Sequence, residues 1–171
     1  MRIGLIGLGD IGGNLAGWLA SQGLAVAGFD IDAGACERAA SRGVAIAPSR
    51  AALIAGADLV ATSLPSLAAI EETAFAGDGL VAAGDRIVTV ECSTTPPELA
   101  RRLTAERIAA GGAAVEASVI GIGKDAAAGD LFFMAAGRPQ DIERAGPFLD
   151  KAGRGWRIVG ESGTASVAKV R

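Results

Sequence analysis

Gly7-Leu8-Gly9-Asp10-Ile11-Gly12 forms a Gly-x-Gly-x-x-Gly motif near the start of a 171-residue chain. The apolar run at residues 2–7 predicts a buried strand, and the helical spacing of apolar residues over 10–21 predicts a helix directly after it. Glycines between such a strand and helix form a tight turn whose backbone amides favour the pyrophosphate of a dinucleotide. In a chain with 25 glycines this spacing also arises by chance. The interpretation therefore depends on the predicted strand and helix on either side of the motif.

Within the motif, Gly7 is expected to allow the turn, Gly9 to let phosphates approach the backbone, and Gly12 to let helix and strand pack closely. Asp30 lies eighteen residues after Gly12, at the end of a second predicted strand over 25–29. Its carboxylate is expected to accept the hydroxyl groups of the adenosine ribose. A 2′-phosphate about 4 Å away would cost about 4 kcal/mol at an effective dielectric of about 20. The sequence therefore favours NAD as cofactor and leaves NADP open.

Strand and helix patterns alternate along the whole chain, joined by short links. Further strands are expected at 44–46, 58–63, 86–90, 113–119, 131–135 and 156–159. Further helices are expected at 33–41, after Pro48, and at 66–74, 96–110, 139–151 and from about 163, with a Gly-rich loop over 121–129. This alternation predicts right-handed βαβ units in a Rossmann-type, doubly wound α/β fold with a mostly parallel sheet and one domain.

The composition excludes several kinds of site. The chain has no His and no Tyr, which excludes a His-based catalytic triad, a His-ligated metal and a tyrosine proton donor. Its 16 basic and 19 acidic residues give a net charge of −3, which does not favour nucleic-acid binding. No apolar run is long enough for a membrane span. Its two cysteines form no disulfide framework or metal motif, so we expect a cytoplasmic protein without a bound metal.

Four further segments accompany the Gly7–Ala16 stretch in a definite order. They are Ser63-Leu64-Pro65, Glu91-Cys92-Ser93-Thr94-Thr95-Pro96, Glu116-Ala117-Ser118-Val119-Ile120-Gly121-Ile122 and Gly163-Thr164-Ala165-Ser166-Val167-Ala168-Lys169. In this order the chain resembles the 3-hydroxyisobutyrate dehydrogenase family, β-hydroxyacid dehydrogenases related to 6-phosphogluconate dehydrogenase. The resemblance extends over essentially the whole chain.

The resemblance implies an oxidoreductase that transfers hydride between a nicotinamide cofactor and a small hydroxy acid or related alcohol or carbonyl substrate. It places the adenosine and pyrophosphate against Gly7, Leu8, Gly9, Asp10, Ile11, Gly12 and Asp30. Leu64 and Pro65 would lie near the nicotinamide half, and Ser93 and Thr94 near the nicotinamide ribose and the substrate. Ser93, Gly121 and Lys169 would contact the substrate, with Ser93 and Lys169 as catalytic residues and Lys169 as the general acid–base group.

Lys169 is also supported by the chemistry of the residues present. Oxidation of an alcohol requires loss of its hydroxyl proton, which a positioned amine can accept. Burial or positive neighbours must first lower the pKa of a lysine from its usual value near 10.4. Because His and Tyr are absent, Lys169 is the leading candidate; the alternative is a solvated lysine near the chain end.

Two features depart from the family pattern. Ile120 and Ile122 replace polar residues of the substrate loop and cannot bind a carboxylate by hydrogen bonds, so a less polar alcohol, carbonyl or imine substrate stays open. The family also has a second, mainly helical domain that completes the substrate pocket and forms a homodimer. We expect residues 1–162 to form the NAD(P)-binding domain and residues 163–171 to begin the interdomain helix, with the C-terminal helical domain absent. The alternative is a stand-alone NAD(P)-binding sensor or interaction module without catalysis.

Overall fold

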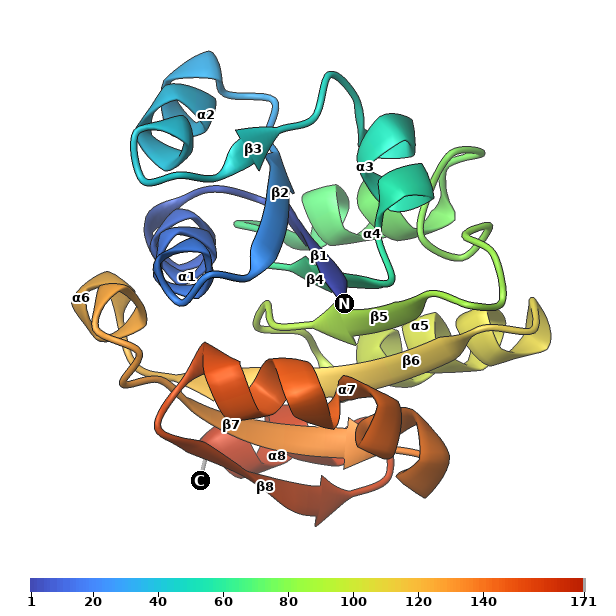
Figure 1. Cartoon of the computed structure of the whole chain (residues 1–171). Helices are drawn as coiled ribbons and strands as arrows, with labels where there is room; N and C mark the ends of the chain where they lie inside the picture. Colours follow the sequence, from blue (N-terminus) through green and yellow to red (C-terminus); the bar gives the residue numbers. More distant parts are fainter. Residues whose placement is uncertain (171) are drawn as a thin grey trace.

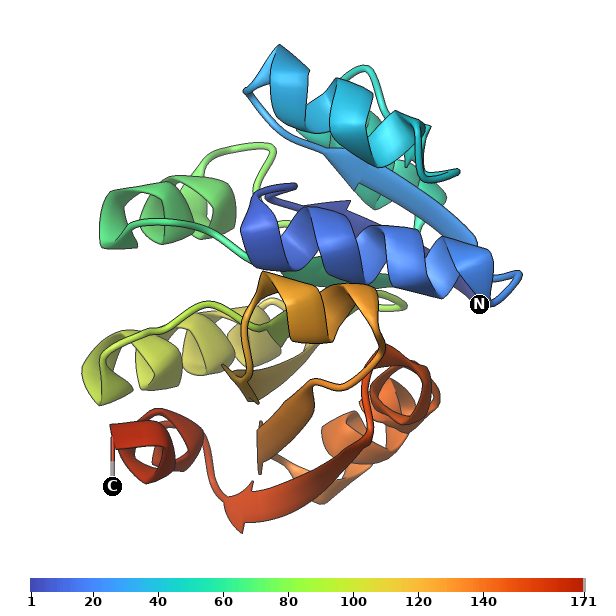
Figure 2. The same cartoon turned by 90° about the vertical axis from the view of Figure 1, so that its left-hand side faces the viewer.

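The computed structural model describes residues 1–170, which form an eight-stranded sheet with helices on both faces (Figures 1 and 2). The strands are β1 (Arg2–Ile6), β2 (Ala25–Phe29), β3 (Ala45–Ile46), β4 (Leu59–Thr62), β5 (Val88–Glu91), β6 (Ala113–Ile120), β7 (Phe132–Gly137) and β8 (Gly155–Gly160). The helices are α1 (Asp10–Ser21), α2 (Ala33–Ala40), α3 (Arg50–Gly56), α4 (Leu67–Phe75), α5 (Pro97–Ala109), α6 (Gly123–Ala127), α7 (Pro139–Ala152) and α8 (Thr164–Val170). Within residues 1–170, no helix combines the length and apolar character needed to cross a bilayer.

The strand order places the start of the chain in the middle of the sheet. The order is β3-β2-β1-β4-β5-β6-β7-β8, and neighbouring strands run parallel except for the antiparallel pair β6 and β7. The chain therefore winds outward from β1 to β3, returns to β4 and continues in the opposite direction. This confirms the predicted doubly wound, mostly parallel fold. Its switch point lies between β1 and β4, where ligands of such sheets bind beyond the carboxyl ends of the strands.

Helices cover both faces of the sheet, which explains why β1 is apolar and buried throughout after Arg2. Helix α7 lies in front of the sheet and α4 and α5 lie behind it in Figure 1, while α1 and α6 face the viewer in Figure 2. Alternate residues of β1 serve the two layers: Ile3 and Leu5 pack with Leu15 of α1, and Ile6 packs with Leu53 of α3. The core therefore has two layers, separated by the sheet.

The Gly-rich segment 121–129 differs from the prediction, because it contains the short helix α6. The N–H of Ile122 donates to Asp125 Oδ2 at 2.9 Å and so organises the first turn of this helix. Helix α6 lies beside α1 (Figure 2), and the N–H of Gly123 donates to Asp10 Oδ2 at 3.2 Å. The prediction of a loop was wrong because contacts with α1, rather than an apolar period, stabilise this helix.

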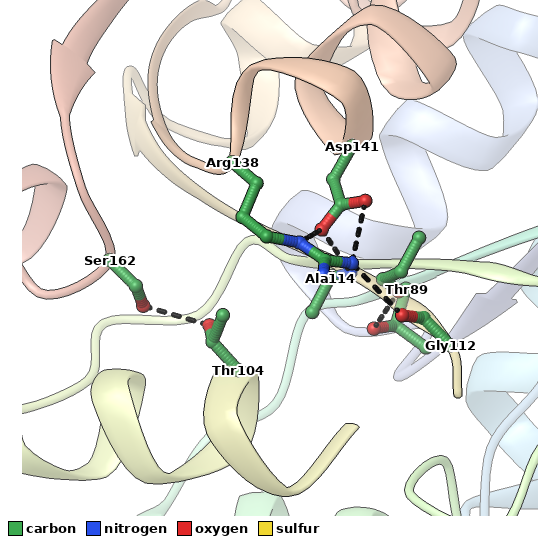
Figure 3. Close-up of polar contacts among 8 residues, drawn as sticks. Thr89, Thr104, Gly112, Ala114, Arg138, Asp141 and Ser162 are labelled. Atoms are coloured by element: carbon green, nitrogen blue, oxygen red, sulfur yellow. Dashed lines mark hydrogen bonds and ion pairs between the residues drawn. The ribbon is translucent and has the colours of Figure 1, made fainter. Parts of the chain in front are cut away.

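Buried polar contacts fix the C-terminal half of the sheet to its helices (Figure 3). Asp141 in the first turn of α7 is 1% exposed and accepts hydrogen bonds from Arg138 Nε at 2.8 Å and from the N–H of Ala114 at 3.5 Å. Thr104 of α5 and Ser162, just before α8, join their hydroxyl groups at 2.8 Å. Partners of this kind compensate the cost of burying polar groups. The contact between Thr104 and Ser162 also sets the position from which α8 starts.

Candidate active site

The turn between β1 and α1 requires glycine at two positions. Gly7 has a φ of 90°, which side chains rarely permit, and its N–H donates to the carbonyl of Phe29 at 3.0 Å. A Cβ atom at Gly7 would overlap the carbonyl oxygen of Ser63, and one at Gly12 would overlap the carbonyl oxygen of Gly7. The first and last glycines of the motif therefore let β1, α1 and the loop after β4 meet closely.

Gly9 has a different role, because it faces open space. Its φ is −67°, and no described atom lies within 4 Å of the position that its Cβ would occupy. Gly9 is the N-cap residue of α1, and no side chain within residues 1–170 caps the helix there. The first amides of α1 and the positive end of its dipole are thus available to an anion. This geometry fits a phosphate group lying against the backbone.

A cleft at the carboxyl ends of β1, β2 and β4 gathers many of the predicted cofactor residues. Its lining includes Gly7, Gly9, Asp10, Ile11, Asp30, Leu64 and Pro65. Leu8 and Gly12 are buried instead: the side chain of Leu8 packs in the core, and only its N–H is directed to Asp30. The structure therefore places the motif on the turn between β1 and α1, where Leu8 and Gly12 support the cleft from within the fold and do not line it.

Asp30 is held in a fixed orientation at the end of β2. Its Oδ2 accepts the N–H of Leu8 at 2.6 Å, and its Oδ1 accepts the N–H of Asp32 at 2.9 Å. A carboxylate offers about four acceptor positions, so both oxygens keep the capacity to accept further hydrogen bonds. Asp30 therefore presents a preorganised acceptor to the cleft.

The cleft also contains residues that the sequence did not single out, among them Phe29, Ile31 and Arg50. Ile31 is 96% exposed and follows Asp30 directly, so its position follows from the predicted end of β2. Arg50 reaches the cleft from α3 and pairs with Glu72 at 2.7 Å and with Asp78. No local pattern marks Arg50, because tertiary packing of α3 brings it to the cleft.

Ser93 joins the loops that follow β4 and β5. Its side chain is buried, and its Oγ accepts the N–H of Leu64, a residue of the cleft, at 2.8 Å. Its own N–H donates to Glu91 Oε1 at 2.7 Å. The hydroxyl of Ser93 thus connects the cleft with the end of β5.

Lys169 of α8 reaches the same edge of the sheet. Its Nζ donates to Thr94 Oγ1 at 2.9 Å, next to Ser93 in the chain. Lys169 is exposed as a whole residue, but its amine is partly buried, and this burial lowers the pKa of the amine. An electrostatic interaction with Cys92 acts in the opposite direction and raises that pKa. This is the direction that a proton acceptor working near neutral pH requires. Gly121 lies in the loop after β6, and no hydrogen bond within residues 1–170 joins its backbone to Lys169.

Two acidic residues occupy neighbouring strands beneath this site. Glu91 of β5 and Glu116 of β6 are partners in the parallel register, and both line a cavity between the sheet and helices α4 and α5. Burial raises the pKa of Glu91, hydrogen bonds from Ser93 oppose that shift, and the charge of Glu116 adds to it. Glu91 at the end of β5 therefore has a second carboxyl group, that of Glu116, beside it on β6.

Residues 2–162 match the family model of the NAD-binding domain of 6-phosphogluconate dehydrogenase. The chain belongs to this family. This NAD-binding domain is 34% identical over 170 residues to the NAD-dependent L-serine dehydrogenase of Pseudomonas aeruginosa, covering 99% of the chain and 57% of the relative. The predicted family and its nicotinamide cofactor are thereby confirmed.

Solved structures of related proteins have the same fold over nearly the whole chain. A 3-hydroxyisobutyrate dehydrogenase of Mycobacterium tuberculosis, solved with L-serine, is 33% identical with a TM-score of 0.91, over 99% of this chain and 58% of that one. Psf3 in complex with NADP⁺ and 2-OPP is 27% identical with a TM-score of 0.93, over 98% of this chain and 60% of that one. The NAD-binding domain described here thus spans less than two thirds of the length of these relatives.

Proposed function

We propose that this NAD-binding domain provides the cofactor site and the proton-transfer group of an NAD(P)-dependent dehydrogenase acting on a small hydroxy acid or related alcohol. The observation that carries the proposal is a continuous connection from cleft to amine. Leu64 lines the cleft and donates to Ser93, and the next residue, Thr94, accepts a hydrogen bond from Lys169. A nucleotide in the cleft and a proton acceptor on α8 would therefore serve the same substrate.

The residues of the cleft suit the parts of a dinucleotide. The open space at Gly9 and the amides of α1 would hold the pyrophosphate. Asp30 would accept the hydroxyl groups of the adenosine ribose, and the exposed side chain of Ile31 beside it would contact the adenine. Leu64 and Pro65 would give the nicotinamide half an apolar wall.

Asp30 supports a preference for NAD. The two backbone amides hold its carboxylate in place, so the carboxylate cannot easily turn away from a 2′-phosphate. The repulsion is on the order of 4 kcal/mol at about 4 Å before rearrangement and screening. One relative is named as NAD-dependent and another was solved with NADP⁺, so the choice rests on local residues such as this carboxylate.

The proposed chemistry divides between the cofactor and the chain. A nicotinamide held against Leu64 and Pro65 would supply the acceptor for the hydride of the substrate carbon. Lys169 in its neutral form accepts the hydroxyl proton, and Thr94 orients the amine through the bond at 2.9 Å. Ser93 would contact the substrate and hold the loop beside the nicotinamide. The exposed Ile120 and Ile122 flank Gly121, so they would favour an apolar portion of the substrate at that loop.

Calorimetric titration with NADH and NADPH tests the cofactor site. We expect NADH to bind more tightly than NADPH, and absence of binding by both at millimolar concentration would overturn the proposal. Turnover of L-serine and 3-hydroxyisobutyrate with NAD, compared between the unaltered protein and Lys169→Ala, tests the catalytic role. Binding without turnover of any hydroxy acid or alcohol would favour a sensor over an enzyme.

A further inference from the structure

Glu116 is a buried carboxylate whose hydrogen bonds lead to α8. It lies in β6 with 2% of its surface exposed. Its Oε2 accepts the N–H of Gly163 at 2.7 Å, and its Oε1 accepts the N–H of Ser166 at 2.7 Å as well as the hydroxyl of Ser166. These three donors come from one short segment at the start of α8.

Disruption of these hydrogen bonds would cost considerable free energy. A buried carboxylate is costly unless its oxygens are hydrogen-bonded, and the first amides of a helix need acceptors outside it. Glu116 and the start of α8 therefore satisfy each other. If either partner is lost, the other is left buried without its hydrogen bonds.

The same segment is linked to the residues that hold the lysine amine. Ser166 Oγ lies 3.2 Å from Thr95 Oγ1, and the adjacent Thr94 accepts the hydrogen bond of Lys169 at 2.9 Å. Ser166 and Lys169 are three residues apart on α8 and so lie on neighbouring positions of the helix surface. Displacement of the start of α8 would consequently move Lys169 away from Thr94.

We infer that Glu116 is a positioning residue that sets the place of Lys169: its carboxylate fixes the first turn of α8 and thereby holds the Lys169 amine against Thr94. The inference rests on the proposed role of Lys169 in proton transfer. Glu116 lies on β6, whereas Lys169 lies on α8. Glu116 therefore acts on Lys169 through the helix and not through contact with the substrate.

The test is an NMR titration of the lysine side chains in the full chain, without cofactor or substrate. The sequence has three lysines, and Lys169→Arg assigns the Lys169 signal. In Glu116→Gln, the amide has one acceptor oxygen in place of two, so the hydrogen bonds to Gly163 and Ser166 cannot all be kept. We expect the pKa of Lys169 to rise toward its ordinary value, because a displaced α8 returns the amine to water.

The direction of this change separates positioning from a direct charge effect. Loss of a negative charge by itself can only lower the pKa of a nearby amine or leave it unchanged. An unchanged or lower pKa in Glu116→Gln would therefore overturn the inference. If this variant fails to fold, Ser166→Ala removes one donor to Glu116, and a pKa of Lys169 that does not rise there would overturn it equally.

Asp141→Asn is the matched control for lost stability. Asp141 is as buried as Glu116, but it bonds to Arg138 and Ala114, and no hydrogen bond within residues 1–170 joins it to α8. We expect this variant to be destabilised with the pKa of Lys169 unchanged; an equal rise in both variants would overturn the inference. Since the titration needs no turnover, its result is independent of whether Lys169→Ala abolishes catalysis.

Discussion

The nucleotide cleft and the lysine site share one edge of the sheet, but they are built from different parts of the chain. The cleft depends on backbone: two glycines permit the close turn, a third leaves open space, and free helix amides face it. The lysine site depends on polar contacts between residues far apart in sequence: Lys169 follows Thr94 by 75 positions, and Gly163 follows Glu116 by 47.

This difference predicts different sensitivities to substitution. In the cleft, the effect of adding a methyl group to a glycine depends on the space around it. Most side chains there can change without removing the backbone amides of α1. In the lysine site, the loss of one buried polar group removes the partner of another, so effects are expected to spread along α8.

The largest effect is expected at Lys169, where a single side chain would perform the proton transfer. In Lys169→Ala we expect turnover to fall by about 10²–10⁴-fold, the usual contribution of a general base. Steady-state kinetics measures this loss, and NADH titration of the same variant should show unchanged affinity. Retained turnover would remove Lys169 from the mechanism.

The next effect concerns the fold of the glycine turn. Gly12→Ala would press a methyl group against the carbonyl oxygen of Gly7, and we expect a loss of about 3 kcal/mol in the free energy of unfolding. Urea unfolding measures this loss. Gly56→Ala is the control, because no described atom lies within 4 Å of its Cβ position. Equal stability of the two variants would show that the turn is looser than the structure indicates.

A smaller effect is expected from Asp30 on cofactor choice. In Asp30→Asn the charge repulsion with a 2′-phosphate is removed, and we expect the ratio of NADPH to NADH affinity to rise by about tenfold, after screening reduces the full Coulomb term. Paired calorimetric titrations measure the ratio. The NAD preference would lose its proposed cause if the ratio stayed as in the unaltered chain.

The smallest effect is a pH dependence of stability from Glu91, whose pKa is raised by burial. The unfolded chain releases this proton first, near its ordinary pKa of 4.5, so stability is lost as the pH rises toward the folded pKa. Glu91→Gln cannot ionise. Its melting temperature relative to the unaltered chain should therefore increase as the pH rises above about 4.5, and a difference independent of pH would contradict the raised pKa.

Sequence patterns predicted the nucleotide cleft, which depends on backbone, well. The apolar run before Gly7 and the helical period after it are local, so the strand, the turn and the position of Asp30 follow from neighbouring residues. The same holds for the alternation that predicted the doubly wound sheet. Local patterns were sufficient because each element carries its own period.

The lysine site could be predicted only in outline. Lys169 and Thr94 stood in recognisable segments, but the hydrogen bonds of Glu116 to the start of α8 depend on how distant segments pack. Helix α6 was missed for the same reason, since Asp10 and α1 stabilise it from 113 residues away. Arg50 of the cleft likewise has its place from tertiary packing.

NADH titration of Gly9→Ala tests directly whether the cleft binds the nucleotide, because Gly9 lines the cleft where no described atom limits its side chain. Gly9 also has a φ of −67°, which alanine adopts without strain. We expect this variant to keep the free energy of unfolding of the unaltered chain but to bind NADH at least about tenfold more weakly, whereas Gly56→Ala binds normally. Undiminished NADH affinity in Gly9→Ala would contradict the assignment of the cleft as the nucleotide site.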